Sequence, residues 1–215
     1  MLSNRQDLRF GEKTVNKREF HMSRKFIDIN EVDTGRIVVS KKHPFGKNCV
    51  KYFVGYCAVD DSPKPLLIKL PKMTGYLKCF AGIEGVESKN MSFIIESEEL
   101  LSKYNSIWNK VSELLAKEFG SEPVFNEKYL KTKIKAHKGE IKTDFHGDTP
   151  PEGKPCVARS IILIDSVCKS GKSFYPQTFL EECVYKVRKE IRDRFLDDDD
   201  DDDESFNNIS CRNNE

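Results

Sequence analysis

The stretch YLKTKIKAH, residues 129–137, is the clearest strand pattern in the chain, and its neighbours are interpreted around it. Successive side chains of a β-strand point to opposite faces. One face of this strand can pack inward through Leu130, Thr132, Ile134 and Ala136. The opposite face carries Tyr129, Lys131, Lys133, Lys135 and His137. The pattern therefore predicts a strand with one buried face and one basic face.

Short apolar or alternating runs precede this strand. They are GRIVVS, CVKYFVGYCAV, PLLIKL, GYLKCF and MSFII, within residues 35–95. Turn-forming segments such as HPFGKN, DDSPKP and PKMTG separate the first four, which is typical of a series of β-strands.

One helix is expected between the two groups of strands. Ser97 is a suitable N-cap, and the acidic residues Glu98 and Glu99 suit the positive end of the helix dipole. Apolar residues recur at helical spacing over residues 100–119, and Gly120 and a following proline end the pattern. The single tryptophan, Trp108, lies on this stripe and is expected in the core.

The β pattern returns after the helix. Residues 129–137 and 140–145 predict a hairpin that turns at residues 138–139. VARSIILIDSV and FYPQTFLEECVYKV predict two further strands joined by the turn CKSGKS, and residues 186–196 suggest a short basic helix. The order of elements predicts a mainly β fold with one long helix, consistent with an OB-like barrel.

Charge divides the chain into a basic body and an acidic tail. The formal net charge is +1 overall, but residues 197–215 carry −8, which leaves +9 in residues 1–196. The acidic run consists of Asp197, Asp198, Asp199, Asp200, Asp201, Asp202, Asp203 and Glu204. Such a block repels itself and stays solvated. The division favours a polyanion as partner, with the tail competing for the same surface, although acidic tails also serve solubility alone.

Three segments are predicted: a flexible polar arm (1–24), one OB-like nucleic-acid-binding domain (25–196) and a disordered acidic tail (197–215). The N-terminal residues contain no apolar signal core, and no apolar run approaches the length of a membrane span. Seven scattered cysteines without zinc-site spacing suggest a reducing compartment. We therefore expect an intracellular protein with no metal, cofactor or membrane partner.

Lysines and aromatic residues are the candidate binding groups. Alternate lysines of a strand lie roughly 6.5–7 Å apart, close to the phosphate repeat of an extended single strand. Lysines follow the phosphates, and rings hold bases without reading sequence. Besides residues 129–137, the candidates are Lys51, Phe53, Lys69, Lys72, Tyr76, Lys78 and Lys142. The alternative is that these lysines only keep the surface hydrated and prevent edge strands from pairing with other chains.

Two enzyme interpretations are weaker. GKS at 171–173 lacks the earlier glycine and the following helix of a phosphate-binding P-loop, so CKSGKS is interpreted as a hairpin turn. Asp165 with Glu181 and Glu182 could bind Mg²⁺ for nuclease chemistry, but no second motif of Asp, Glu, His or Lys completes such a site, and a structural aspartate at a strand end is favoured. A binding protein is therefore favoured over an enzyme.

Several segments resemble a known family. KYLKTKIKAH, IKTDFHG, SIILIDSV and YPQTFLEECVYK, with PLLIKLPKMTGY and MSFII…IWNKVSELL, are similar to the poxvirus-like single-stranded DNA-binding proteins of large nucleocytoplasmic DNA viruses. Related reading frames occur in virus-like mobile elements. The resemblance spans roughly residues 50–200 and is densest over 128–187.

The resemblance implies an OB-like fold, sequence-independent binding of single-stranded DNA, and a role in viral or mobile-element replication in the host nucleus or a cytoplasmic viral factory. It also implies self-association on the strand and contact of the tail with a polymerase or helicase, and it brings no catalytic residues. Two alternatives stay open: a virion or regulatory protein–protein interaction module, and a metal-dependent nuclease.

Overall fold

The computed structural model describes residues 25–46, 48–57, 62–81, 87–119, 123, 125, 129–137 and 140–188. The predicted arm (1–24) and acidic tail (197–215) lie outside these ranges. Tyr129 and His137 belong to strands, but their side chains lie outside the description.

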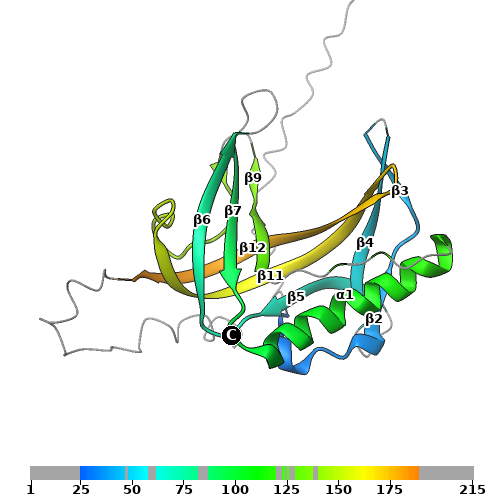
Figure 1. The fold of residues 1–215 in the computed structure, drawn as a ribbon, viewed down its shortest axis with the longest axis horizontal. Helices are drawn as coiled ribbons and strands as arrows, with labels where there is room; N and C mark the ends of the chain where they lie inside the picture. Colours follow the sequence, from blue (N-terminus) through cyan, green and yellow to red (C-terminus); the bar gives the residue numbers. More distant parts are fainter. Residues whose placement is uncertain are drawn as a thin grey trace, which may run out of the picture.

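The fold is mainly β with one long helix, which confirms the predicted class (Figure 1). Two short 3-10 helices, η1 (Ile29–Glu31) and η2 (Thr34–Arg36), precede α1 (Glu98–Phe119). The strands are β1 (Ile27–Asp28), β2 (Ile37–Val39), β3 (His43–Phe45), β4 (Cys49–Cys57), β5 (Pro63–Lys69), β6 (Met73–Ala81), β7 (Glu87–Ile94), β8 (Tyr129–Ile134), β9 (Ala136–His137), β10 (Glu140–Ile141), β11 (Pro155–Ser170) and β12 (Ser173–Val187). None of the helices in the described ranges combines the length and the apolar character that a membrane crossing requires.

The long hairpin β11–β12 organises the sheet. One edge of β11 pairs with β12 along most of its sixteen residues. The other edge pairs in turn with β6, β5 and β4, at residues 155–158, 161–164 and 166–170. In Figure 1 this hairpin runs from the upright strands β6 and β7 to β4 and β3. A single strand thus joins the two parts of the sheet.

The free edge of β12 extends the sheet in the other direction. β12 pairs with β8 in parallel, β8 pairs with β7, and β7 pairs with β6, the last two antiparallel. Because β6 also pairs with β11, the series of pairings β11, β12, β8, β7 and β6 returns to its first strand.

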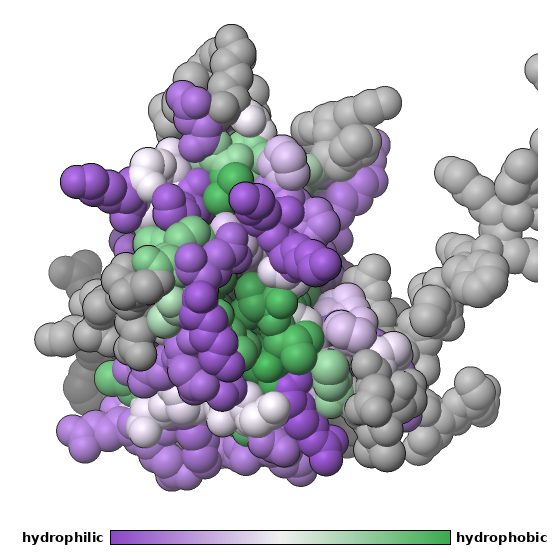
Figure 2. Space-filling model, turned by 90° about the vertical axis from the view of Figure 1, so that its right-hand side faces the viewer, coloured by the Kyte–Doolittle hydropathy of each residue, from purple (hydrophilic) through white to green (hydrophobic). Residues whose placement is uncertain are grey.

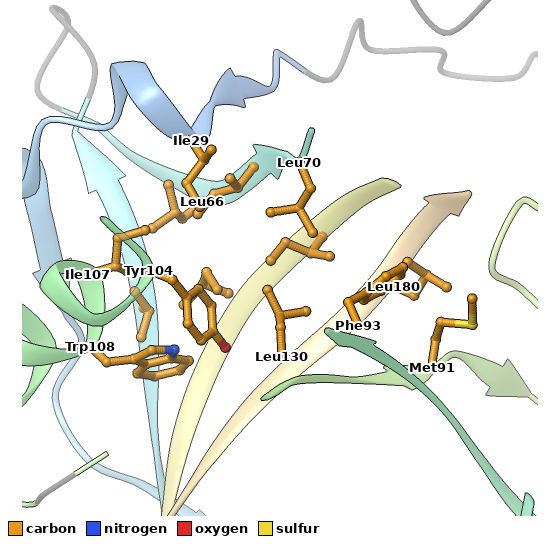
Figure 3. Close-up of a cluster of buried hydrophobic side chains, with 14 of the residues drawn as sticks. Ile29, Leu66, Leu70, Met91, Phe93, Tyr104, Ile107, Trp108, Leu130 and Leu180 are labelled. Carbon is orange, nitrogen blue, oxygen red and sulfur yellow. The ribbon is translucent and has the colours of Figure 1, made fainter. Parts of the chain in front are cut away.

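Helix α1 and the sheet share one apolar core. The backbone N–H of Leu100 donates to Ser97 Oγ at 3.3 Å, so the predicted N-cap is confirmed. Trp108 is 2% exposed and packs against the rings of Tyr104 and Phe125, as expected of a core residue. Figure 3 shows α1 side chains facing residues of β5, β7, β8 and β12, including Phe93. Burial of each such large side chain contributes about 1.5–3 kcal/mol.

Three strand predictions need correction. The predicted strand at 129–137 is interrupted at Lys135, and Ala136 is exposed rather than packed inward. The second hairpin strand ends at Ile141 rather than at 145, because Thr143 leaves the ladder: its hydroxyl donates to the carbonyl of Leu180 at 2.7 Å and accepts the Lys135 N–H at 3.1 Å. Strand β12 continues to Val187, so the basic helix predicted from residue 186 is wrong at its start.

Candidate nucleic-acid interface

The strand pairings bring a set of lysines and rings onto one face of the sheet. Directly paired residues of neighbouring strands share a face. Cys168 pairs with both Lys51 and Tyr175, and Lys133 pairs with Phe179 and Asn90. The face that results, here called the basic-aromatic face, carries Phe45, Lys51, Phe53, Tyr76, Lys78, Asn90, Lys131, Lys133, Tyr175, Gln177 and Phe179.

The part of this face on β3, β4 and the start of β12 is called the aromatic end. Its rings are exposed: Phe45 by 55%, Phe53 by 40% and Tyr175 by 51%. Lys51 Nζ lies 4.7 Å from the centroid of the Phe53 ring and 5.6 Å from that of Phe45. Figure 2, viewed from the right-hand side of Figure 1, shows apolar groups exposed among hydrophilic side chains. Exposed rings gathered at one place are typical of a binding surface.

The part on β8, β7 and β6 is called the lysine end. Lys131, Lys133 and Lys78 are exposed there, and Lys133 Nζ donates to Gln177 Oε1. The inward side of β8 is buried at Leu130 and Thr132, so the predicted alternation of a buried and a basic face is confirmed over these residues. Lys135, just after β8, lies 5.6 Å from the centroid of the Phe179 ring.

The two ends are electrostatically connected through Cys168. Burial raises the pKa of the Cys168 thiol, and the ammonium groups of Lys51 and Lys133 oppose this rise. The geometric link lies at β12, where Gln177 accepts a hydrogen bond from Lys133 and pairs with Ser166, which pairs with Phe53 on its other side. The two ends of the basic-aromatic face therefore adjoin each other at Gln177.

A small pocket opens beside the lysine end. Within the described strands, the pairing of β8 with β12 covers two residues on each strand. Next to these pairs is a pocket of about 150 Å³, lined by Asn90, Tyr104, Lys131, Thr132, Lys133, Pro176 and Thr178. Its amide, hydroxyl and ammonium groups are donors for phosphate or base oxygens.

Some predicted binding residues lie elsewhere. Lys69 Nζ lies 5.6 Å from the centroid of the Phe26 ring, beside the small apolar cluster of Leu67 and Ile161. Lys72 is exposed between β5 and β6. Lys142 follows β10, and its Nζ pairs with Glu140 Oε2 at 2.7 Å. The assignment of Lys72 and Lys142 to the binding surface gains no support. Lys69 differs, because it pairs with Ile161, which lies on the same side of β11 as Leu163, the partner of Phe179. Lys69 therefore shares the side of the sheet that carries the basic-aromatic face.

Several residues of the face were not predicted from the sequence. Phe45 lies in the segment HPFGKN. The sequence predicts a turn there, but the first three residues form β3. Tyr175, Gln177 and Phe179 alternate along β12, which is a usable signal, although the intervening Pro176 obscures it. Asn90 joins the face through the pairing of β7 with β8, which no local pattern reports.

The proposed catalytic carboxylates do not converge. Asp165 Oδ2 is 2.8 Å from Lys51 Nζ and accepts a hydrogen bond from Ser166 Oγ at 2.8 Å. Asp165 lies beside Thr178 in the hairpin register, and Glu182 is four positions further, about 13 Å along the strand. Within the described ranges, no three His, Cys, Asp or Glu side chains are grouped to hold a metal ion.

The GKS segment forms a hairpin turn, as predicted. Ser170 pairs with Ser173, so Gly171 and Lys172 make a two-residue loop between β11 and β12. Gly171 has φ +57°, which suits the first position of such loops.

Comparison with models of protein families gives no match, and no curated protein matches the chain. The basic-aromatic face is therefore interpreted from its own chemistry.

Proposed function

We propose that the protein binds single-stranded DNA without reading its sequence, and that it is a binding protein rather than an enzyme. The observation that carries the proposal is the continuous basic-aromatic face, with exposed rings at one end and lysines at the other. Rings stack on any base, and ammonium groups follow the phosphates, so this combination retains a strand of any sequence.

The size of the face suits a short stretch of nucleotides. Because β6 pairs back with β11, the path from β4 across β11, β12, β8 and β7 to β6 follows the outer side of a closed series, and its five strand spacings amount to about 24 Å along that curved surface. An extended single strand would cover this distance with roughly four nucleotides, at the lower limit of the site size of one OB fold.

We further propose that the returning series of strands is an OB-like barrel. The order β6, β7, β8, β12, β11, with the β8–β12 contact parallel and the others antiparallel, supports this assignment. In an OB-fold, the second and third strands and the loop between the last two bind oligonucleotides. In this chain those parts correspond to β7, β8 and the turn next to Tyr175, which are parts of the basic-aromatic face.

The acidic tail and the biological role complete the proposal. Residues 197–204 lie outside the described residues, and their charge makes them a competitor for the lysines when no strand is bound. Resemblance to the viral family supports a role in viral or mobile-element replication inside the cell, with the tail contacting a polymerase or helicase. Removal of residues 197–215 should tighten strand binding most at low salt, where screening is weakest.

Fluorescence anisotropy with labelled oligo-dT, duplex of equal length and heparin tests the function at about 50 mM and about 200 mM salt. A label on the ligand is needed because Trp108 is buried and is a poor reporter of the surface. We expect oligo-dT to bind more tightly than duplex or heparin, with affinity falling as salt rises. Equal binding of heparin would favour the protein–protein interaction module, and Mg²⁺-dependent cleavage of the oligonucleotide would favour the nuclease.

A further inference from the structure

Two lysines beside the proposed path of the strand are already paired with carboxylates. Lys51 Nζ lies 2.8 Å from Asp165 Oδ2, and Lys135 Nζ pairs with Glu181 Oε1. Both carboxylates are largely shielded from solvent, since the side chain of Asp165 is 19% exposed and that of Glu181 is 8% exposed. These are not the loose, fully exposed ion pairs that contribute little.

Each carboxylate is held by a separate irregularity of the long hairpin. In β11, Ile164 pairs with Thr178 and Ser166 pairs with Gln177, so Asp165 is an extra residue. The second irregularity is in β12, where Leu180 pairs with Ile162 and Glu182 pairs with Ile161, which leaves Glu181 as the extra residue.

A β-bulge inserts one unpaired residue and redirects its side chain. Two independent bulges in the same hairpin therefore each bring a carboxylate to a lysine contributed by a neighbouring segment, β4 in one case and the residue that follows β8 in the other.

We infer that Asp165 and Glu181 occupy positions that phosphates of the bound strand take over. A carboxylate oxygen and a phosphate oxygen make the same charge-assisted hydrogen bond to an ammonium group. The inference rests on the proposed function and concerns how the same face is regulated. In the free protein the two internal pairs neutralise Lys51 and Lys135, and an incoming strand must displace both carboxylates.

This exchange sets the affinity and the salt dependence of the face. A phosphate that replaces a carboxylate gains one ion pair while another is lost, so its net contribution is small. Binding then depends on stacking and on the exposed lysines of β8, and a polyanion that offers charge without bases is retained weakly. Neutralising either carboxylate should convert its lysine into a full phosphate contact.

The test uses the full chain with Asp165→Asn or Glu181→Gln and measures oligo-dT affinity over a salt series. Each substitution is expected to tighten binding roughly three- to ten-fold at low salt and to steepen the slope of log affinity against log salt by about 0.7. The control is Glu113→Gln, which makes the same change of net charge on α1, where Glu113 pairs with Lys110 at 2.9 Å. Thermal melts of every variant check that the fold is retained.

A double-mutant cycle separates the specific pair from the general effect of charge. Asp165→Asn is also measured in a Lys51→Met background, where the gain should disappear because no ammonium group is left to release. The inference is overturned if Asp165→Asn and Glu181→Gln tighten binding no more than Glu113→Gln, or if Asp165→Asn is equally effective without Lys51.

Failure of the proposed function gives a different result. In that case the unmodified chain and every variant, Asp165→Asn and Glu181→Gln included, bind oligo-dT no better than heparin. If oligo-dT is preferred but the two carboxylate variants behave like the Glu113→Gln control, the function stands and the inference alone is rejected.

Discussion

The aromatic end and the lysine end of the basic-aromatic face offer two different kinds of binding energy. At the aromatic end, exposed rings surround a lysine that is already paired with Asp165. At the lysine end, exposed ammonium groups stand on β8, and the exposed ring of Phe80 lies on the same side of β6 as Lys78. Stacking depends little on salt, whereas phosphate contacts depend on it strongly. A surface divided in this way can hold a strand when either contribution is weakened.

The largest effect is expected from the core that both ends share. Phe93 is fully buried on β7, beneath the lysine end. Phe93→Ala should lower the free energy of unfolding by about 3–5 kcal/mol, because it removes a large ring and leaves a cavity. Phe80→Ala, an exposed ring on β6, is the control and should cost far less.

Urea denaturation followed by circular dichroism and by anisotropy of a bound oligonucleotide measures both variants. If the two ends share one core, both signals change in a single transition. Two separate transitions, in which the lysine end unfolds at a lower urea concentration than the aromatic end, would show that the two ends do not belong to one folded unit.

Loss of a ring should be the largest effect on binding alone. Phe53→Ala and Tyr175→Ala should each weaken oligo-dT binding by about 1–3 kcal/mol at any salt concentration, since each ring stacks on a base. The slope of log affinity against log salt should stay unchanged. Val187→Ala, which removes an exposed apolar group at the far end of β12, should have little effect. A changed slope would mean that the aromatic end acts through charge.

Alkaline pH should weaken the packing behind both ends. Burial raises the pKa of Cys156, which lies on β11 opposite β6, to about 11, and that of Tyr52 behind the aromatic end to about 12. These groups stay neutral in the fold but ionise near 9 and 10 once unfolded, so their stabilisation is complete below pH 9 and is lost between pH 9 and 12.

For Cys156 the loss is about 1.4 kcal/mol per pH unit between its unfolded pKa of 9.0 and its folded pKa of about 11. Thermal melts between pH 8 and 10.5 should show a smaller decline for Cys156→Ala than for the unmodified chain. Parallel declines in the two proteins would contradict this account.

The smallest effects are expected at single lysines. Lys131→Gln and Lys133→Gln should each reduce the salt slope by about 0.7 and weaken binding mainly at low salt, because one phosphate contact is lost. Lys117→Gln on α1 is the control and should leave the slope unchanged. If salt-independent affinity falls instead, the lysine end contributes more than charge, and the adjacent pocket at Asn90 becomes the next target.

Local features of the fold could be predicted from the sequence. The cap at Ser97, the helical stripe that includes Trp108 and the alternation around Leu130 depend on residues close in the chain, and the structure has them as expected. The ends of strands were harder to predict, because a side chain such as Thr143 can make hydrogen bonds that replace those between neighbouring strands.

The composition of the binding face could be predicted only in part. Gln177 and Lys133 meet because β12 pairs with β8 in parallel, and that contact joins segments about 45 residues apart in the chain. Bulges at Asp165 and Glu181 depend on the register of two long strands, which periodicity alone cannot specify. The sequence therefore indicates candidate lysines, and the strand pairings show which of them share one side of the sheet.

The sixteen residues of β11 run the length of the sheet and contact three strands along one edge. Neither end of the face can separate from the body without breaking hydrogen bonds to this one strand. We therefore expect spontaneous opening to be confined to the rim of the sheet, and the amide hydrogens of β11 to exchange with deuterium only when the whole body unfolds. Under the proposed function, the strand would therefore leave a platform that stays folded rather than one that opens.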